Sequence, residues 1–215
     1  MSLLELNNIS YNYDGKKNVI KNVNYSFDKG KVYAITGRSG AGKTTLLSLL
    51  SGLTAPTQGE ILFNNVNIKK INKYDFRSRY VGVIFQSFNL LPHLNSVENV
   101  ELSMRASGKK TPNRRQNAEE ILKKVCLDDS LAKRRILKLS GGEQQRVAIA
   151  RAISYEPEII LADEPTGNLD SATQDEIVSI FKSLAHNDGK CVIIVTHSPV
   201  VAKAADEIFE LAPLK

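Results

Sequence analysis

Apolar residues near the start of this chain are spaced at close to alternate positions. Residues 3–13 and 19–27 both follow this spacing, and Asp14-Gly15 interrupts the run between them. Alternation of this kind predicts half-buried β-strands joined as a hairpin. A further strand and turn are predicted at 59–65, so we expect a small N-terminal antiparallel β lobe.

Continuous apolar runs predict buried strands in the rest of the chain. These runs lie at 31–36, 81–85, 159–162, 192–195 and 207–211. Helical segments follow several of them, at 44–50, from Gly141, from Ser171 and near Val200. Such alternation of strands and helices predicts a parallel sheet covered by helices.

A purely helical stretch interrupts this alternation between Asn95 and about Leu139. It opens on Asn95-x-x-Glu98, which is typical of a helix cap. We therefore expect a single α/β domain. Its β lobe and α/β core comprise about 1–86 and 156–215, and its inserted helical lobe comprises about 87–155.

The stretch that follows the strand at 31–36 fits the phosphate-binding P-loop, G-x-x-x-x-G-K-[ST]. Its members are Gly37, Arg38, Ser39, Gly40, Ala41, Gly42, Lys43 and Thr44. Glycines let backbone N–H groups surround an anion, and the next helix adds the positive potential of its N-terminus. We expect Lys43 to meet the β- and γ-phosphates and Thr44 to bind Mg²⁺. A glycine-rich turn that only caps a helix is the alternative, and the strand–loop–helix setting favours the nucleotide.

Polar side chains follow three of the predicted buried strands. Asp163 and Glu164 end one strand, His197 follows the next and Gln86 closes a third. Because ligands of such sheets bind at the carboxyl ends of the strands, these residues are expected beside the P-loop. Asp163 would hold Mg²⁺ through water, Glu164 would polarise the water that attacks the γ-phosphate, and His197 would donate to that phosphate. Gln86 can bond both water and a metal ligand. Each has an ordinary structural alternative, as a polar strand end or loop residue.

Two interpretations apply to Leu139-Ser140-Gly141-Gly142-Glu143. Structurally, Ser140 and Glu143 form the S-x-x-E capping box of the helix that follows. Functionally, Gly141 and Gly142 expose a helix N-terminus, which is a second site for an anion. One nucleotide could not occupy this site and the P-loop of the same chain at once. The pair of sites therefore indicates a head-to-tail dimer around shared nucleotides, and both interpretations can hold together.

Composition and charge leave the fold prediction unchanged but limit the partners. The 215 residues are 42% hydrophobic and 24% charged, as in ordinary globular proteins. The net charge of +6 is compatible with nucleic acid, anionic lipid or simple solubility, and the basic residues form only short clusters. No apolar run approaches the roughly 20 residues of a membrane span, and the N-terminus lacks a secretory signal, so we expect a cytoplasmic protein. Cys126 and Cys191 stand alone in apolar segments and are expected to serve packing.

Taken in order along the chain, these motifs resemble the nucleotide-binding subunit of an ATP-binding cassette (ABC) transporter from about residue 3 to residue 211. The runs Val83–Pro92 and Leu161–Asp170 further resemble the macrolide-exporter and lipoprotein-releasing (MacB and LolD) group. The resemblance implies a P-loop NTPase fold with a RecA-like parallel-sheet core, ATP hydrolysis, and ATP and Mg²⁺ as cofactors. It also implies a second copy of the chain and an integral membrane permease as partners. No nucleic acid is expected.

The same resemblance implies a role for each matching residue. ATP would be bound by Tyr13, which stacks on adenine, by the Walker A residues Gly37 to Thr45, and, across the dimer, by Ser140, Gly141, Gly142 and Asp170. Mg²⁺ would be bound by Thr44, Gln86 and Asp163, and the reaction would depend on Glu164, His197 and Gln86. Tyr11 lies two residues before Tyr13 and leaves the adenine assignment open. The permease would dock near 88–94 and hold the protein at the inner face of the membrane. One departure is Ser198, which stands where the family usually has Asp.

Three other functions compete with this one. Asn72-Lys73-Tyr74-Asp75 matches the guanine-reading N-K-x-D of GTPases, but it precedes the Mg²⁺-site Asp163 instead of following it, which indicates chance. ABC ATPases that act on DNA or ribosomes usually carry a coiled coil or a second cassette, for which 215 residues leave no room. A mechanical or regulatory ATPase similar to the cell-division protein FtsE stays open.

Overall fold

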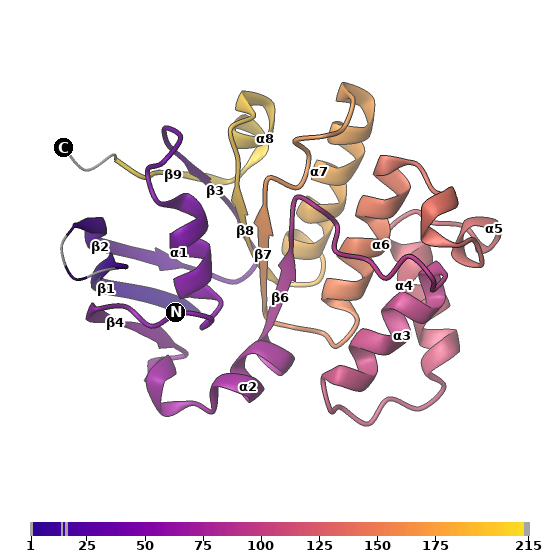
Figure 1. Cartoon of the computed structure of the whole chain (residues 1–215), viewed down its shortest axis with the longest axis horizontal. Coiled ribbons are helices and arrows are strands. Elements are labelled where there is room, and N and C mark those ends of the chain that lie inside the picture. The colour runs from indigo at the N-terminus through magenta and orange to yellow at the C-terminus, as the bar shows by residue number, and fades with distance from the viewer. Residues whose placement is uncertain (1, 14, 16, 213–215) are drawn as a thin grey trace.

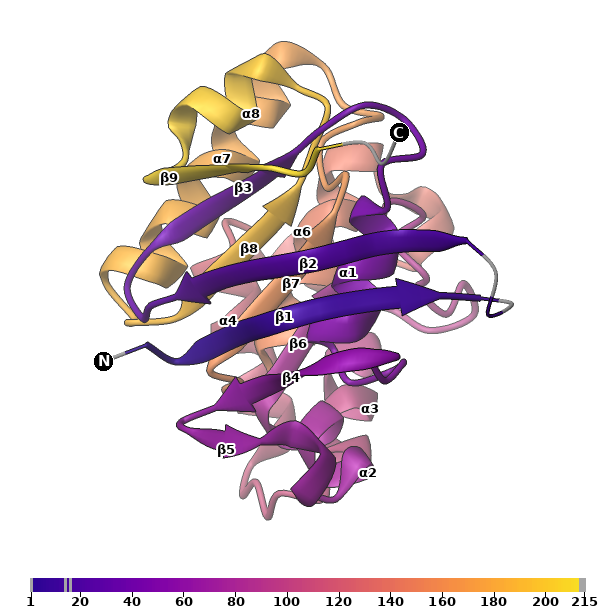
Figure 2. The same ribbon diagram turned by 90° about the vertical axis from the view of Figure 1, so that its left-hand side faces the viewer.

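The computed structural model describes residues 2–13, 15 and 17–212, and its N-terminal part forms an antiparallel sheet. The strands lie in the order β2-β1-β4-β5 (Figure 2). They are β1 (Leu4–Asn12), β2 (Asn18–Phe27), β4 (Gln58–Phe63) and β5 (Val66–Asn67). The predicted β lobe and hairpin are confirmed, while Asp14 of the predicted turn lies outside the described residues.

A parallel sheet forms the centre of the molecule, in the order β6-β7-β8-β3-β9 (Figure 1). Its strands are β3 (Val32–Thr36), β6 (Val81–Ile84), β7 (Ile159–Asp163), β8 (Cys191–Val195) and β9 (Glu207–Glu210). Every neighbouring pair is parallel, which confirms the predicted sheet. The strands predicted at 31–36, 81–85 and 207–211 are each one residue shorter than expected.

Helices cover the parallel sheet and extend beyond its β6 edge (Figure 1). They are α1 (Lys43–Leu50), α2 (Lys73–Asp75), α3 (Ser96–Ala106), α4 (Arg114–Lys124), α5 (Asp129–Ala132), α6 (Gly141–Ile153), α7 (Ser171–His186) and α8 (Pro199–Ala204). Short helical turns lie at 68–70, 76–80 and 136–138. Helices α3 to α6 gather at one end of the molecule, as expected of the helical lobe.

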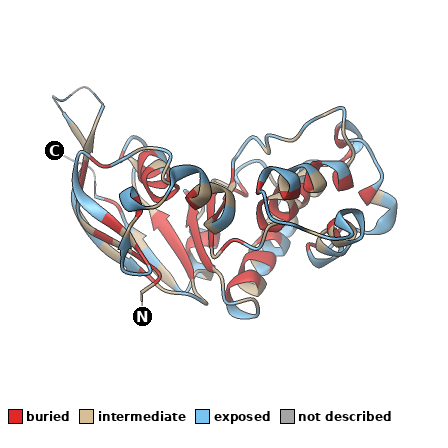
Figure 3. Ribbon diagram, turned by 90° about the horizontal axis from the view of Figure 1, so that it is seen from below, coloured by how far each residue is buried: buried red, intermediate tan, exposed pale blue. Residues whose placement is uncertain are grey.

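Alternate side chains of the central strands enter two different cores. In β7, Ile160 and Ala162 belong to the core that includes the helical lobe and α7. Ile159 and Leu161 belong to the core that includes α1 and the antiparallel sheet. Both faces of the central strands are therefore buried (Figure 3), which is why β7 and β8 are almost entirely apolar, whereas the edge strand β9 carries Glu207 and Glu210.

Capping boxes begin two helices of the helical lobe. Asn95 Oδ1 accepts from the Glu98 amide at 2.9 Å, and Glu98 Oε2 accepts from the Asn95 amide at 2.8 Å. The same exchange joins Ser140 and Glu143 at 3.3 and 2.7 Å. Both predicted caps are confirmed, and each supplies partners to N–H groups that a helix start leaves unpaired.

The two cysteines differ in their surroundings. Cys191 is buried in β8, and burial raises the pKa of its thiol to about 12. Cys126 is exposed, so the expectation that it serves packing is wrong. The chain turns there through a left-handed residue, Cys126 at φ 60°, and the flanking Val125 and Leu127 fill the core instead. Among the residues that the structure describes, no helix is long and apolar enough to cross a bilayer.

Gly59 in β4 permits a close contact with an irregular part of β1. Its φ is +78°, and a Cβ there would lie 2.3 Å from the carbonyl oxygen of Asn7. We expect Gly59→Ala to lower the free energy of unfolding by about 3 kcal/mol, roughly 1 from the left-handed backbone and 2 from the contact. Gly189→Ala is the matched control, because Gly189 has φ +66° and a Cβ on it would meet nothing within 4 Å. Urea denaturation of both variants measures the difference, and equal losses would contradict the contact.

Candidate nucleotide-binding site

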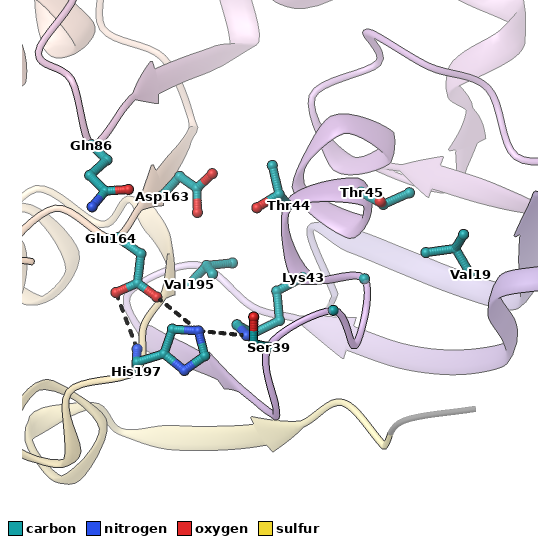
Figure 4. Close-up of a pocket in the computed structure, with 12 residues that line it drawn as sticks. Val19, Ser39, Lys43, Thr44, Thr45, Gln86, Asp163, Glu164, Val195 and His197 are labelled. Carbon is teal, nitrogen blue, oxygen red and sulfur yellow. Dashed lines mark hydrogen bonds and ion pairs between the residues drawn. The ribbon is translucent and has the colours of Figure 1, made fainter. Parts of the chain in front are cut away.

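An open pocket of about 510 Å³ lies where the N-terminus of α1 faces the carboxyl ends of β6, β7 and β8 (Figure 4). The predicted residues that line it are Ser39, Gly40, Gly42, Lys43, Thr44, Thr45, Gln86, Asp163, Glu164 and His197. Val19 and Val195 also line it and were not predicted. The structure thus brings the P-loop and all three polar strand ends together. Val19 gave no signal in the sequence, because it reaches the pocket only through the packing of β2.

Gly42 shapes the entry into α1. It adopts φ +93°, and a Cβ there would lie 3.0 Å from the Val19 carbonyl oxygen. Gly42 occupies the N-cap position without a side-chain hydrogen bond, so the first N–H groups of α1 stay free for a ligand. Ala41 is buried and its amide donates to the Arg38 carbonyl at 3.1 Å, which closes the loop.

Lys43 places its ammonium at the floor of the pocket. The side chain is buried, and Nζ donates to the carbonyl oxygens of Gly37 at 3.0 Å and Arg38 at 3.1 Å. It also lies 3.1 Å from Nε2 of His197. Because an ammonium can only donate, that nitrogen accepts, and the imidazole proton of neutral His197 is on Nδ1. A phosphate entering the pocket would meet a cation already held in position.

The two adjacent acids at the end of β7 have different environments. Burial raises the pKa of Asp163, while the hydroxyl of Thr44 and the charge of Lys43 act in the opposite direction. Glu164 adopts φ +46°, and its Oε2 accepts from the His197 amide at 3.1 Å. Its Oε1 is buried, has no hydrogen-bond partner among the described residues and lies 3.7 Å from Nε2 of His197. Glu164 therefore has one carboxylate oxygen at the pocket, beside the His197 ring, that accepts no hydrogen bond (Figure 4).

The oxygen atoms on this side of the pocket suit Mg²⁺. Thr44, Asp163 and Gln86 supply a hydroxyl, a carboxylate and an amide, which are the hard ligands that Mg²⁺ prefers. Figure 4 draws Gln86 beside Asp163 and Glu164. Within the described residues no cluster of three or more His, Cys, Asp and Glu side chains forms a metal site. An ion here would take its remaining ligands from water and phosphate, as Mg²⁺ commonly does.

A second group of predicted residues lies outside the pocket. Ser140 and Gly141 are exposed at the start of α6, and a Cβ on Gly142 would lie 2.5 Å from Cγ2 of Thr173 in α7. Asp170 caps α7 by accepting from the amide and hydroxyl of Thr173 at 3.0 and 2.8 Å, which lowers the pKa of Asp170. The structure thus joins Ser140, Gly141, Gly142 and Asp170 around the ends of two helices, apart from the P-loop.

Other sequence features take local structural roles. Asn72 of the N-K-x-D match caps α2 by accepting from the Tyr74 amide at 2.9 Å, and Asp75 pairs with Arg79 at 3.2 Å. None of the four matched residues lines the pocket. A guanine site at 72–75 therefore has no support in the fold.

Ser198, which departs from the family pattern, caps α8 by accepting from the Val201 amide at 3.4 Å.

Tyr13 and Tyr11 differ in what they offer a nucleotide base. The Tyr13 ring is 71% exposed, and its hydroxyl lies 2.9 Å from the Thr45 hydroxyl at the pocket wall. Tyr11 is partly buried against the core and meets Tyr13 edge to face at 5.1 Å. The exposed ring beside the P-loop helix favours Tyr13 as the adenine contact.

We predict that Tyr13→Ala raises the dissociation constant for ATP by about 10-fold, because stacking on a base contributes roughly 1–3 kcal/mol. Tyr13→Phe keeps the ring and should change it by less than about 3-fold. Tyr11→Ala should lower thermal stability and leave ATP affinity nearly unchanged. Titration with a fluorescent ATP analogue measures all three. A loss of affinity in Tyr11→Ala alone would transfer the adenine contact to Tyr11.

Comparisons with known proteins agree with this geometry. A family model described as ABC transporter matches residues 20–167. The chain is 46% identical over 207 residues to an uncharacterized ABC transporter ATP-binding protein, YclH of Bacillus subtilis, in a match that covers 96% of this chain and 92% of YclH. It is 41% identical to the macrolide export ATP-binding/permease protein MacB of Pasteurella multocida, over 97% of this chain but 33% of MacB.

Solved structures of MJ0796 from Methanocaldococcus jannaschii are also similar. A dimeric structure of this ABC transporter cassette has a TM-score of 0.87 at 39% identity and covers 97% of this chain and 94% of that one. A dimeric post-hydrolysis state bound to ADP and Pi has a TM-score of 0.87 at 38% identity, over 99% and 97% of the two chains. The predicted fold class is confirmed by these matches.

Proposed function

We propose, from the premise that this chain is an ATP-binding subunit of the ABC transporter family, that two copies of it close around two ATP molecules and drive a separate membrane permease. Its activity is ATP hydrolysis, with ATP and Mg²⁺ as cofactors. The observation that carries the proposal is the separation of two phosphate-binding ends. The P-loop lines the pocket, whereas Ser140 and Gly141 are exposed elsewhere on the surface.

The pocket supports in-line attack of water on the γ-phosphate. The free N–H groups of α1 and the Lys43 ammonium would neutralise the phosphates. Glu164 would accept a proton from the attacking water through Oε1, which accepts no hydrogen bond among the described residues, and the neighbouring His197 would orient the γ-phosphate. Mg²⁺, held by Thr44, Asp163 and Gln86, would stabilise charge on the phosphate oxygens.

The second anion site explains why two copies are required. Ser140 and Gly141 are both exposed at the N-terminus of α6, where Ser140 is the N-cap. A single chain cannot bring it to its own P-loop, so a partner copy would supply it across the nucleotide, with Asp170 at the same contact. The similarity to a dimeric cassette supports this arrangement.

Exposed apolar side chains that follow β6 and lie on α3 support docking of a permease. Phe85 and Leu91 are 43% and 41% exposed, and Leu102 on α3 is 45% exposed. We place the permease contact at 88–94, which would hold the protein at the inner face of the membrane. MacB, by its name, combines ATP-binding and permease parts, and this chain matches a third of its length. That similarity supports an export or extrusion system.

Co-purification tests the permease. The tagged chain, recovered from detergent-solubilised membranes of its own cells, should retain an integral membrane protein that stimulates its ATPase. Leu91→Glu should lose that protein, while Leu53→Glu, which alters a leucine 68% exposed and outside this surface, should keep it. Recovery of the chain alone would overturn the transporter role. A retained partner that moves no solute in vesicles would instead support a mechanical ATPase similar to FtsE.

A further inference from the structure

Arg151 near the end of α6 carries a charge that is not neutralised by an acidic side chain. Burial lowers the pKa of its guanidinium, while Tyr155 acts in the opposite direction, and no ion pair joins Arg151 to an acidic side chain within the described residues. Its two terminal nitrogens donate instead to main-chain oxygens, Nη2 to Phe88 at 2.9 Å and Nη1 to Asn89. A partly buried cation satisfied by carbonyl groups alone is costly, which indicates that the contact itself has a role.

The two residues that Arg151 holds have a strained backbone. Phe88 and Asn89 both adopt left-handed conformations, at φ 55° and 51°. Consecutive residues with a Cβ rarely adopt this region, and Phe does so at a higher cost than Asn. The turn therefore depends on contacts from outside it. Figure 1 shows the chain leaving β6 and crossing α6 on its way to α3.

Asn99 of α3 holds the end of the same segment. Its side chain is 1% exposed. Oδ1 accepts from the Leu91 amide at 2.9 Å, and Nδ2 donates to the Leu91 carbonyl at 3.2 Å and to the Asn95 carbonyl at 2.9 Å. The amide thus pairs with both main-chain groups of Leu91, as a neighbouring strand would.

The held segment begins next to a residue of the pocket. Gln86 precedes Phe88 by two positions, and its Nε2 would lie 3.4 Å from a Cβ built on Gly167 in the loop after Glu164. The Gln86 side chain is exposed and makes no hydrogen bond within the described part of the chain that would fix it by itself. The Gln86 side chain is therefore placed only through its backbone, which β6 holds on one side and the segment 87–91 on the other.

We propose that Arg151 and Asn99 are positioning residues that clamp 87–91 to the helical lobe and so keep Gln86 at the metal side of the nucleotide pocket. The inference rests on the proposed function, because it takes Gln86 as a ligand of Mg²⁺. It assigns a reaction-related role to two residues that touch neither nucleotide nor metal.

The test combines amide exchange with the Mg²⁺ dependence of ATP turnover in the purified chain. Arg151→Lys keeps the charge but loses the two-pronged contact, and should raise exchange at 88–91 by about 10-fold. It should also raise the Mg²⁺ concentration for half-maximal turnover by about 10-fold, because residues that hold a metal ligand in place contribute this much to metal affinity. The kcat at saturating Mg²⁺ should be nearly unchanged. Asn99→Asp, which loses both donors with little change of shape, should act in the same direction and serves if Arg151→Lys folds poorly.

Arg146→Lys is the matched control. Arg146 lies on the same helix and donates to the Val125 carbonyl at 3.4 Å, away from 87–91. It should alter neither exchange at 88–91 nor the Mg²⁺ requirement. Unchanged exchange in Arg151→Lys would overturn the clamp, and faster exchange with an unchanged Mg²⁺ requirement would overturn its role in positioning Gln86. Gln86→Ala distinguishes the proposed Mg²⁺ role of Gln86 from the proposed clamp by Arg151 and Asn99. If Gln86→Ala leaves the Mg²⁺ requirement unchanged, the metal role of Gln86 fails. Amide exchange at 88–91 in Arg151→Lys then decides by itself whether the clamp exists.

Discussion

Replacement of Lys43 by alanine is expected to raise the dissociation constant for ATP by at least about 100-fold. Its ammonium would make charge-assisted hydrogen bonds to two phosphates, and each such bond contributes about 1.5–3 kcal/mol. The two hydrogen bonds together contribute roughly 3–6 kcal/mol to the binding of ATP. A loss of about 2.7 kcal/mol is enough to raise the dissociation constant by about 100-fold. Equilibrium titration with a fluorescent ATP analogue measures the change.

The position of Lys43 makes a structural effect of this substitution small. Its Nζ donates to two main-chain carbonyls, of Gly37 and Arg38. Because Lys43 itself lines the open pocket, water would take the place of its ammonium in the variant. Lys73→Ala is the matched control, because Lys73 belongs to the N-K-x-D match and does not line the pocket. That variant should bind ATP as the original chain does. Normal ATP binding by Lys43→Ala would contradict the P-loop assignment, and tight binding of GTP alone would revive the GTPase interpretation.

The parts of the site that were predictable are those that depend on neighbours in sequence. The P-loop is read from the eight residues at 37–44, and Asp163, Glu164 and His197 were placed because parallel strands present their carboxyl ends at one edge. Both capping boxes needed only a spacing of three residues. The order of the central strands was not predictable in this way, because β3 pairs with β8 and β9, which are distant in sequence.

The parts that were missed depend on packing between distant segments. Arg151 and Phe88 are 63 positions apart, and nothing in either local sequence relates them. Val19 enters the pocket because β2 passes beside Gly42. The prediction for Cys126 was wrong because α4 ends at Lys124 and the chain turns through a left-handed Cys126, which leaves Val125 and Leu127 in the core. Periodicity gives the face of a helix but not the residue at which it stops.

Glu164→Gln is expected to lower ATP turnover by about 10²- to 10⁴-fold while ATP binding is kept, because general-base catalysis contributes this much and an amide cannot accept the proton. The substitution fits the structure. Oε2 only accepts from the His197 amide, which the amide oxygen of Gln can also do, and the Glu164 amide still donates to the Val195 carbonyl at 2.9 Å. Steady-state turnover and nucleotide titration at saturating Mg²⁺ measure the two quantities.

The same variant tests the proposed dimer. With hydrolysis blocked, two copies should stay closed around ATP, and light scattering should give twice the monomer mass with MgATP and the monomer mass without it. Glu156→Gln is the matched control, since Glu156 also adopts a left-handed conformation, φ 57°, but lies outside the pocket. It should turn over ATP normally and form no lasting dimer. Unchanged turnover in Glu164→Gln would remove Glu164 from its proposed role. A low turnover with a persistent monomer would instead contradict the contact between one P-loop and the α6 terminus of a second copy.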